Sequence, residues 1–125
     1  MLNGQKIIKS CMRFDIISLF PGLIKDSFQH GVIGKALKNS KIVLETLNPR
    51  DFTEEINGRI DDRPYGGGPG MVMQADPLIK AIRKAKENSD HPYVIYMSPQ
   101  GRHFNQEKAI EFSEKEHLVI VCGRY

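Results

Sequence analysis

Apolar residues gather in short runs along the chain, and these runs alternate with stretches that carry apolar residues at helical spacing. Runs rich in Phe, Ile, Val and Leu predict buried strands over residues 14–19, 42–47, 93–97 and 118–122. A strand that is apolar on both faces must be covered on both sides, which is typical of parallel sheets between helices. The pattern therefore predicts an α/β fold class, with a mostly parallel sheet covered by helices.

Three helices are expected between these strands. The first follows Gly31, after a break at the Phe-Pro-Gly of residues 20–22. The second is opened by Asp76 as N-cap with Pro77 as the first helical residue, and it ends near Asn88. The third is capped by Asn105. Helices and strands thus alternate along most of the chain.

No helical pattern follows the last apolar run, residues 118–122. A strand without a covering element exposes unpaired backbone groups at the edge of its sheet. We expect either an open edge here or a chain that is part of a longer protein, and we favour the second.

Composition is that of one globular domain. The 125 residues are 40% hydrophobic and 26% charged, which is enough apolar content for a core. The net charge of +3 is too small to indicate nucleic-acid binding by itself. The charge is uneven, since residues 1–50 carry eight basic and three acidic side chains and the remainder is slightly acidic.

The cysteines and histidines indicate neither disulfides nor a metal site. Cys11 and Cys122 form no spaced framework, so free thiols in a reducing compartment are expected. No apolar run reaches the roughly 18 residues of a membrane span, and the start of the chain lacks the core of a secretory signal. We therefore expect a cytoplasmic protein. The histidines show no metal-ligand spacing, and each is expected on the surface or in a loop: His30, His91, His103 and His117.

A glycine-rich segment, residues 61–71 (DDRPYGGGPGM), is the most unusual stretch of the sequence. Four glycines and two prolines within seven residues exclude a helix interior or a strand interior. Glycine also lets a ligand or another backbone approach closely. The segment is therefore either a surface presented to a ligand or a turn-rich linker. Asp61 and Asp62 are interpreted as turn formers or solvated charges rather than as metal ligands or a base.

Two short loops follow predicted strands and are candidates for a binding site. They are residues 98–101 (Ser-Pro-Gln-Gly) and 122–125 (Cys-Gly-Arg-Tyr). In parallel sheets, ligands collect outside the carboxyl ends of the strands. The alternative is that both are ordinary turns between strand and helix. The sequence lacks a dinucleotide fingerprint, a P-loop and a nucleophile elbow, and no base can be assigned to Ser98.

Five segments together resemble one family, the bacterial tRNA (guanine-N1)-methyltransferases with the trefoil-knot (SPOUT-type) fold. They occur in the family's order and are residues 12–21, 48–52, 61–71, 97–101 and 122–125. The resemblance implies that residues 12–125 form the N-terminal part of a knotted methyltransferase domain. It also implies that knot completion and a C-terminal tRNA-binding domain lie beyond Tyr125. Residues 1–11 precede the family's usual start, and we expect them to be a disordered, dispensable extension.

The resemblance also implies a reaction: transfer of a methyl group from S-adenosylmethionine to N1 of the guanine 3′ of the anticodon in tRNA. The family works as a homodimer with a shared active site, and a divalent cation such as Mg²⁺ assists catalysis. By position, the residues around the cofactor would be Tyr96, Met97, Ser98, Pro99, Gly101, Gly123 and Tyr125. Those beside the target guanine and the tRNA would be Tyr65, Gly66, Gly67, Gly68, Pro69, Gly70 and Met71.

No residue of this chain is assigned a catalytic role, because the family's general base would lie beyond Tyr125. The resemblance therefore implies that the chain by itself is inactive. Two other interpretations stay open from the residues alone. One is a non-enzymatic module that binds nucleotides or phosphate through the N–H groups of the glycine-rich segment. The other is an inert fragment whose open strand edge pairs with another copy.

Overall fold

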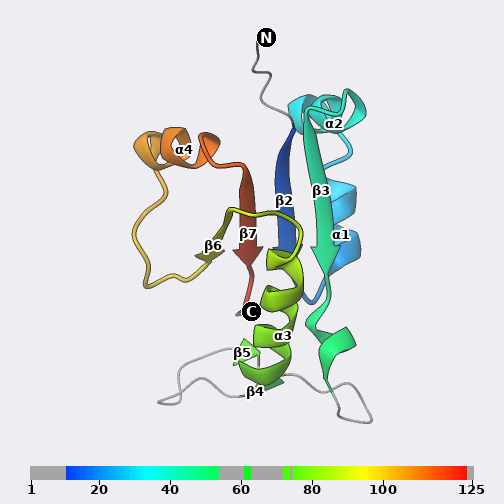
Figure 1. Ribbon diagram of the computed structural model, residues 1–125, viewed down its shortest axis with the longest axis vertical. Coiled ribbons are helices and arrows are strands. Elements are labelled where there is room, and N and C mark those ends of the chain that lie inside the picture. Colours follow the sequence, from blue (N-terminus) through cyan, green and yellow to red (C-terminus); the bar gives the residue numbers. More distant parts are fainter. Residues whose placement is uncertain (1–10, 54–60, 63–71, 74, 124–125) are drawn as a thin grey trace.

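The computed structural model describes residues 11–53, 61–62, 72–73 and 75–123, and Figure 1 shows their arrangement. The described part of the chain forms a four-stranded sheet in the order β3-β2-β7-β6, in which every neighbouring pair is parallel. The strands are β2 (Met12–Ile17), β3 (Ile42–Leu47), β6 (Pro92–Tyr96) and β7 (His117–Val121). The predicted α/β class with a parallel sheet is confirmed.

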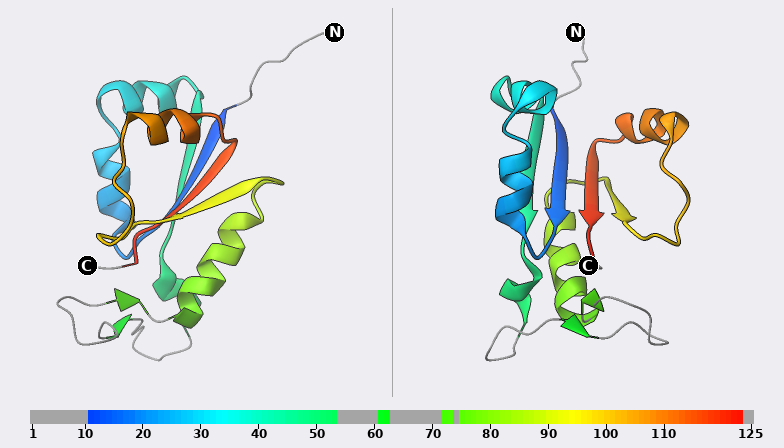
Figure 2. Two further views of the ribbon diagram at one scale, coloured as in Figure 1. Left: turned by 90° about the vertical axis from the view of Figure 1, so that its left-hand side faces the viewer. Right: turned by 180° about the vertical axis from the view of Figure 1, so that it is seen from behind.

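Helices lie on both faces of this sheet. Figure 2 shows α3 (Ala75–Lys86) on one face, and α1 (Pro21–Ser27), α2 (Gly31–Lys38) and α4 (Gln106–Ser113) on the other. Right-handed crossovers explain this division. The chain moves in one direction along the sheet from β2 to β3 and from β6 to β7, but in the opposite direction from β3 to β6. Among the described residues, no helix is long and apolar enough to cross a membrane.

The helix starts correct one sequence prediction, confirm another and add a helix that the sequence did not indicate. β2 ends before the expected break at residues 20–22, and Pro21 then begins α1, because proline is preorganised for the first turn of a helix. The helix α3 begins at Ala75, so Asp76 lies in its first turn and not at the N-cap. Asn105 does cap α4, since its Oδ1 accepts a hydrogen bond of 2.9 Å from the N–H of Lys108.

The core lies between the sheet and α3. Ile17 of β2 and two valines of β7 are fully buried against Ala81 and Ala85, and Leu47, Phe52, Leu78 and Ile82 pack around them. By contrast, α1, α2 and α4 contain no buried residue. The 3-10 helix η1 (Pro49–Phe52) follows β3 and brings Phe52 to this cluster.

The expectation that residues 93–97 form a strand buried on both faces is wrong. β6 is an edge strand of the described sheet, and Val94, Tyr96 and the following Met97 are 40%, 50% and 53% exposed. Of the two alternatives for the last strand, the less favoured one, an open edge, does not apply, because β7 lies between β2 and β6 in the described sheet. Apolar runs indicate strands, but they do not distinguish an interior strand from one at the edge.

A polar cluster is buried on the α3 face, where β2 and β7 begin. The carboxylate of Asp15 lies 2.6 Å from Nε2 of His117, and both side chains are fully buried. Nε of Arg13 donates to the same carboxylate at 2.8 Å, and Asn88 donates at 3.3 Å. Ser89 Oγ lies 2.6 Å from Nδ1 of His117. His117 is therefore not the surface or loop histidine that the sequence predicted.

Each buried charge in this cluster has a partner. The hydrogen bonds that Arg13 donates to the Asp15 carboxylate raise the pKa of the Arg13 guanidinium, which stays charged. Nη2 of Arg13 also lies 2.7 Å from Oε1 of Glu45 on β3, and the Glu45 side chain is 61% exposed. The cluster thus connects three strands and the loop after α3 at one end of the sheet.

Replacing the buried carboxylate should destabilise the fold strongly. Asp15→Asn leaves Arg13 and His117 without their anion, and breaking a buried pair costs about 3–5 kcal/mol. The measurement is the free energy of unfolding from urea denaturation. The control is Glu45→Gln, because the exposed Arg13–Glu45 pair contributes less than about 1 kcal/mol. Equal losses in the two variants would contradict this account.

Replacing Gly34 by alanine should disturb the packing of α2 against the turn that follows α1. A Cβ there would lie 2.5 Å from the backbone oxygen of Gln29, so the turn between the helices must shift. We expect Gly34→Ala to lower the free energy of unfolding by about 1–3 kcal/mol. Gly22 of α1 is the matched control, since a Cβ there meets nothing within 4 Å and alanine favours helix. Gly22→Ala should be neutral or stabilising in the same denaturation experiment.

Candidate functional site

The two loops that the sequence singled out leave the same edge of the sheet. β6 and β7 are neighbours, and Tyr96 pairs with Val121 in their register. The N–H of Met97 donates to the Val121 carbonyl at 2.9 Å, and the N–H of Cys122 donates to the Ile17 carbonyl at 2.9 Å. The parallel ladder therefore extends past both strands before the loops begin. Residues 97–101 and 122–123 lie side by side at the carboxyl end of the sheet.

Tyr96 and Gly123 make the closest contact between these segments. A Cβ built on Gly123 would lie 2.6 Å from Oη of Tyr96 and 2.9 Å from its Cε2. The phenol ring thus lies directly over a backbone position that has room only for glycine. Gly123 is buried, whereas the Tyr96 side chain remains half exposed. This contact places a half-exposed aromatic side chain on a buried stretch of main chain.

Residues 98–101 form a tight turn held by Ser98. Its carbonyl accepts from the N–H of Gly101 at 3.1 Å, and its Oγ accepts from the N–H of Gln100 at 3.1 Å. All residues from Met97 to Gly101 are exposed, including Pro99. Because the Ser98 hydroxyl is used by the turn, the structure gives it a conformational role and not that of a nucleophile.

Cys122 lies between the two strand ends as a half-buried thiol. Its burial raises its pKa above the ordinary value, because desolvation disfavours the thiolate. A protonated thiol is a weak nucleophile and packs like a small apolar side chain. Cys122 therefore contributes shape to the site.

The glycine-rich segment is bounded by a short antiparallel pair. β4 (Asp61–Asp62) and β5 (Val72–Met73) are joined with Asp61 opposite Met73. Figure 1 shows this pair near the first turn of α3, at the end of the molecule toward which β2, β3 and β7 point. Eight of the predicted site residues lie outside the described part of the chain: Tyr65, Gly66, Gly67, Gly68, Pro69, Gly70, Met71 and Tyr125.

The titratable side chains of the described site are the Tyr96 phenol and the Cys122 thiol. Residues 97–101 and 122–123 contain no carboxylate, imidazole or amine. They offer main-chain N–H and C=O groups, the Tyr96 ring and the Met97 side chain. Elsewhere in the described residues, histidine, cysteine and carboxylate side chains do not gather into a group of three that could hold a metal ion. This arrangement suits a ligand with a planar ring and polar edges.

Sequence reasoning found the two loops but missed the contact that joins them. Tyr96 and Gly123 are far apart in the chain, and neither has a partner at any spacing that would indicate the pair. The only signal was that Tyr96 lies near the end of one apolar run and Gly123 directly follows another. That signal becomes specific once β6 and β7 are known to be neighbours.

Comparison with known proteins relates the chain to one family. The family model described as "tRNA (Guanine-1)-methyltransferase TrmD" matches residues 12–125. A tRNA (guanine-N(1)-)-methyltransferase of Methylococcus capsulatus is 49% identical over 115 residues, which cover 91% of this chain and 46% of the relative. One from Nitrosospira multiformis is 50% identical over 117 residues, covering 90% of this chain and 46% of the relative. The chain spans about half the length of the curated relatives it matches.

A solved structure has the same fold. The crystal structure of tRNA (m1G37) methyltransferase from Aquifex aeolicus matches with a TM-score of 0.78 and 34% sequence identity. The match covers 90% of this chain and 51% of that chain. The predicted relation to the SPOUT-type methyltransferase fold is confirmed by this similarity. On the family match and these identities, the chain belongs to the tRNA (guanine-N1)-methyltransferase family.

Proposed function

We propose that this chain carries the cofactor-binding loops of an enzyme that methylates N1 of the guanine 3′ of the anticodon in tRNA, with S-adenosylmethionine as donor. The observation that carries the proposal is the meeting of two loops at the carboxyl ends of β6 and β7, with the Tyr96 ring over Gly123. Family membership supports the choice of tRNA and of guanine.

The residues of this site fit an adenosine-containing cofactor. Gly123 has no side chain of its own, and main-chain groups of residues 122–123 can hydrogen-bond the edges of an adenine. The exposed residues 97–101 provide a second stretch of backbone beside the first. S-adenosylmethionine, when bound, supplies an electrophilic methyl group on a positively charged sulfur.

The roles of the individual residues follow from their placement. Ser98 fixes the turn with its hydroxyl, and Pro99 limits its conformations. Gly101 closes the turn through its N–H. Tyr96 and Met97 present half-exposed side chains that can cover a bound ring and exclude water. These residues bind and orient, while the proton of guanine N1 must be accepted by a group outside these loops.

The wider assembly belongs to the same proposal. We place the glycine-rich residues 65–71 beside the target guanine, and we expect the whole enzyme to act in the cytoplasm as a homodimer. Apolar side chains are exposed around β6 and α4, and the interface of a homodimer would cover such a surface. They include Tyr93, Val94, Phe104 and Ile110. The described residues do not fit a divalent cation, so no catalytic step is assigned to one.

A methyl group at Gly123 should reduce cofactor affinity without unfolding the chain. In Gly123→Ala the new Cβ displaces the Tyr96 ring, and this half-exposed side chain can move away at little cost in stability. We expect the dissociation constant for S-adenosylmethionine to rise at least tenfold, which is a loss of about 1.4 kcal/mol in binding free energy. The measurement is calorimetric titration.

Two controls make that titration specific. Gly22→Ala, on α1 and in open space, should bind S-adenosylmethionine as tightly as the unchanged chain. ATP should not bind measurably to the unchanged chain. Equal affinity for ATP would favour the alternative of a general nucleotide- or phosphate-binding module. Unchanged affinity in Gly123→Ala would show that the cofactor does not use this contact.

The chain alone should not methylate tRNA. The described loops contain no group that can accept the guanine proton, and we propose that the acid–base residues lie in a part of the enzyme that these 125 residues do not include. The assay is transfer of a labelled methyl group to a tRNA transcript with G at the position 3′ of the anticodon. Methyl transfer by the purified chain, above the level given by a transcript with A at that position, would contradict the proposal.

A further inference from the structure

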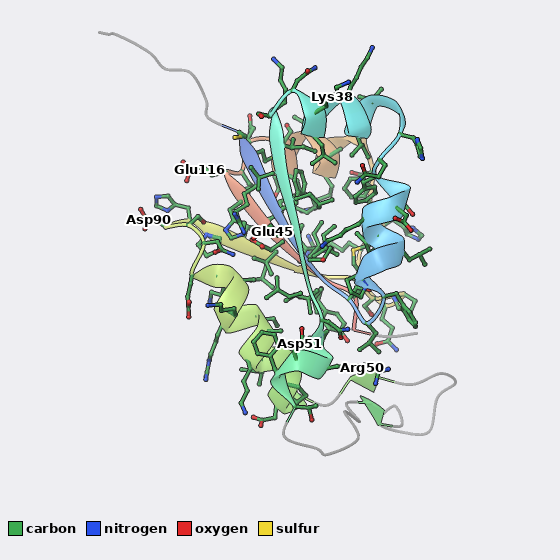
Figure 3. All side chains as sticks on the ribbon, turned by 90° about the vertical axis from the view of Figure 1, so that its right-hand side faces the viewer. Lys38, Glu45, Arg50, Asp51, Asp90 and Glu116 are labelled. Carbon is green, nitrogen blue, oxygen red and sulfur yellow. The ribbon has the colours of Figure 1, made fainter. Side chains whose placement is uncertain are left out.

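A basic groove lies at the opposite end of the molecule from the candidate cofactor site. Two adjoining hollows of about 450 Å³ and 600 Å³ share Gln29, Gly34 and Lys38. Lys25 of α1 lines the first and Lys35 of α2 lines the second. We call this surface the α2 groove. Figure 1 shows α2 at the end of the sheet where β2 begins, and Figure 3 labels Lys38 there, far from Arg50 and Asp51 at the other end.

The groove is shaped by a close approach of backbone. Gly34 packs so near to the Gln29 carbonyl that a Cβ would lie 2.5 Å away. The turn between α1 and α2 therefore packs closely against α2, and Lys25, Lys35 and Lys38 line the hollows beside it. Lys35 and Lys38 are one helical turn apart, which puts their Cβ atoms about 5–6 Å from each other on one face.

The positive charge of the groove is not neutralised from within. Among the described residues, no carboxylate forms an ion pair with Lys25, Lys35 or Lys38. Other lysines do have such partners, since Lys84 lies 3.7 Å from Glu87 and Lys108 lies 3.1 Å from Glu111. Exposed Lys41 adds a further charge just after α2. Like charges this close repel one another unless an anion lies between them.

We propose that the α2 groove is a second RNA-contacting surface, which binds the phosphodiester backbone of the tRNA away from the reacting guanine. A row of unpaired lysines along an open groove complements a row of phosphates, and such contacts position RNA without reading its sequence. The groove and the candidate cofactor site lie at opposite ends of the sheet, so the same substrate would be held at two places. The choice of tRNA as the RNA rests on the proposed function.

The test compares two pairs of lysines on opposite faces of the sheet. Lys35→Gln/Lys38→Gln removes two charges from the groove, and Lys84→Gln/Lys86→Gln removes two exposed charges from α3 as the matched control. Binding of a fluorescent tRNA transcript to the full chain is followed by anisotropy at several salt concentrations. Each variant is also titrated with S-adenosylmethionine.

The groove variant should lose RNA affinity in a salt-dependent way. Each phosphate contact contributes about 0.9 to the slope of log K against log salt, so the slope should fall by nearly 2 for the groove pair. At about 0.1 M salt the affinity should drop at least tenfold. The α3 pair should change the slope little, and affinity for S-adenosylmethionine should be the same in all variants.

Four results would overturn the inference. The first three are no RNA binding by the unchanged chain, an equal loss in the groove and α3 pairs, and an unchanged slope in the groove pair. The inference would also be overturned if the groove pair lost binding to inorganic phosphate or to anionic phospholipid vesicles while its RNA affinity stayed unchanged. If S-adenosylmethionine bound to none of the proteins but the groove pair still lost RNA affinity, the proposed function would fail and the groove would stand.

Discussion

The parallel pairing of β2 with β7 is the interaction on which the rest of the structure depends. It joins the first described strand to the last and places β7 in the interior of the sheet. Asp15 and His117 reinforce it at the amino end, and Ile17 and Val121 pack with α3 at the carboxyl end. Without this pair, the β2–β3 and β6–β7 units would separate. The buried carboxylate also favours one register, because a slip by one residue would turn it toward the opposite face.

The candidate site follows directly from that arrangement. β7 brings Gly123 beside Tyr96 only because β6 pairs with it in parallel. Both loops then leave the sheet at the same end, where neither strand continues and the backbone is open to a ligand. Asp15 of β2 and His117 of β7 lie toward the opposite end of the sheet, so the buried polar cluster and the candidate site are at opposite ends of β7.

The two binding surfaces that we propose lie at opposite ends of the sheet. The carboxyl end of the sheet carries the exposed loops and the β4–β5 pair, and the amino end carries the α2 groove. The described residues of the candidate loops, 97–101 and 122–123, contain no charged side chain, whereas the lysines of the groove have no ion pair among the described residues. The two surfaces that we propose for a cofactor with a planar base and for a polyanion such as RNA therefore differ in charge.

The sequence by itself determined the elements and their class. Apolar runs located the four strands of the sheet, Asn105 marked a helix start, and the motifs at residues 61–71, 98–101 and 122–125 indicated the family. Local chemistry decides these features, because burial periodicity and capping act between residues near in sequence. Only the tertiary structure decided which strands are interior, that His117 is buried against Asp15, and that Tyr96 lies over Gly123. These depend on strand order, and no run of residues encodes its own neighbour in a sheet.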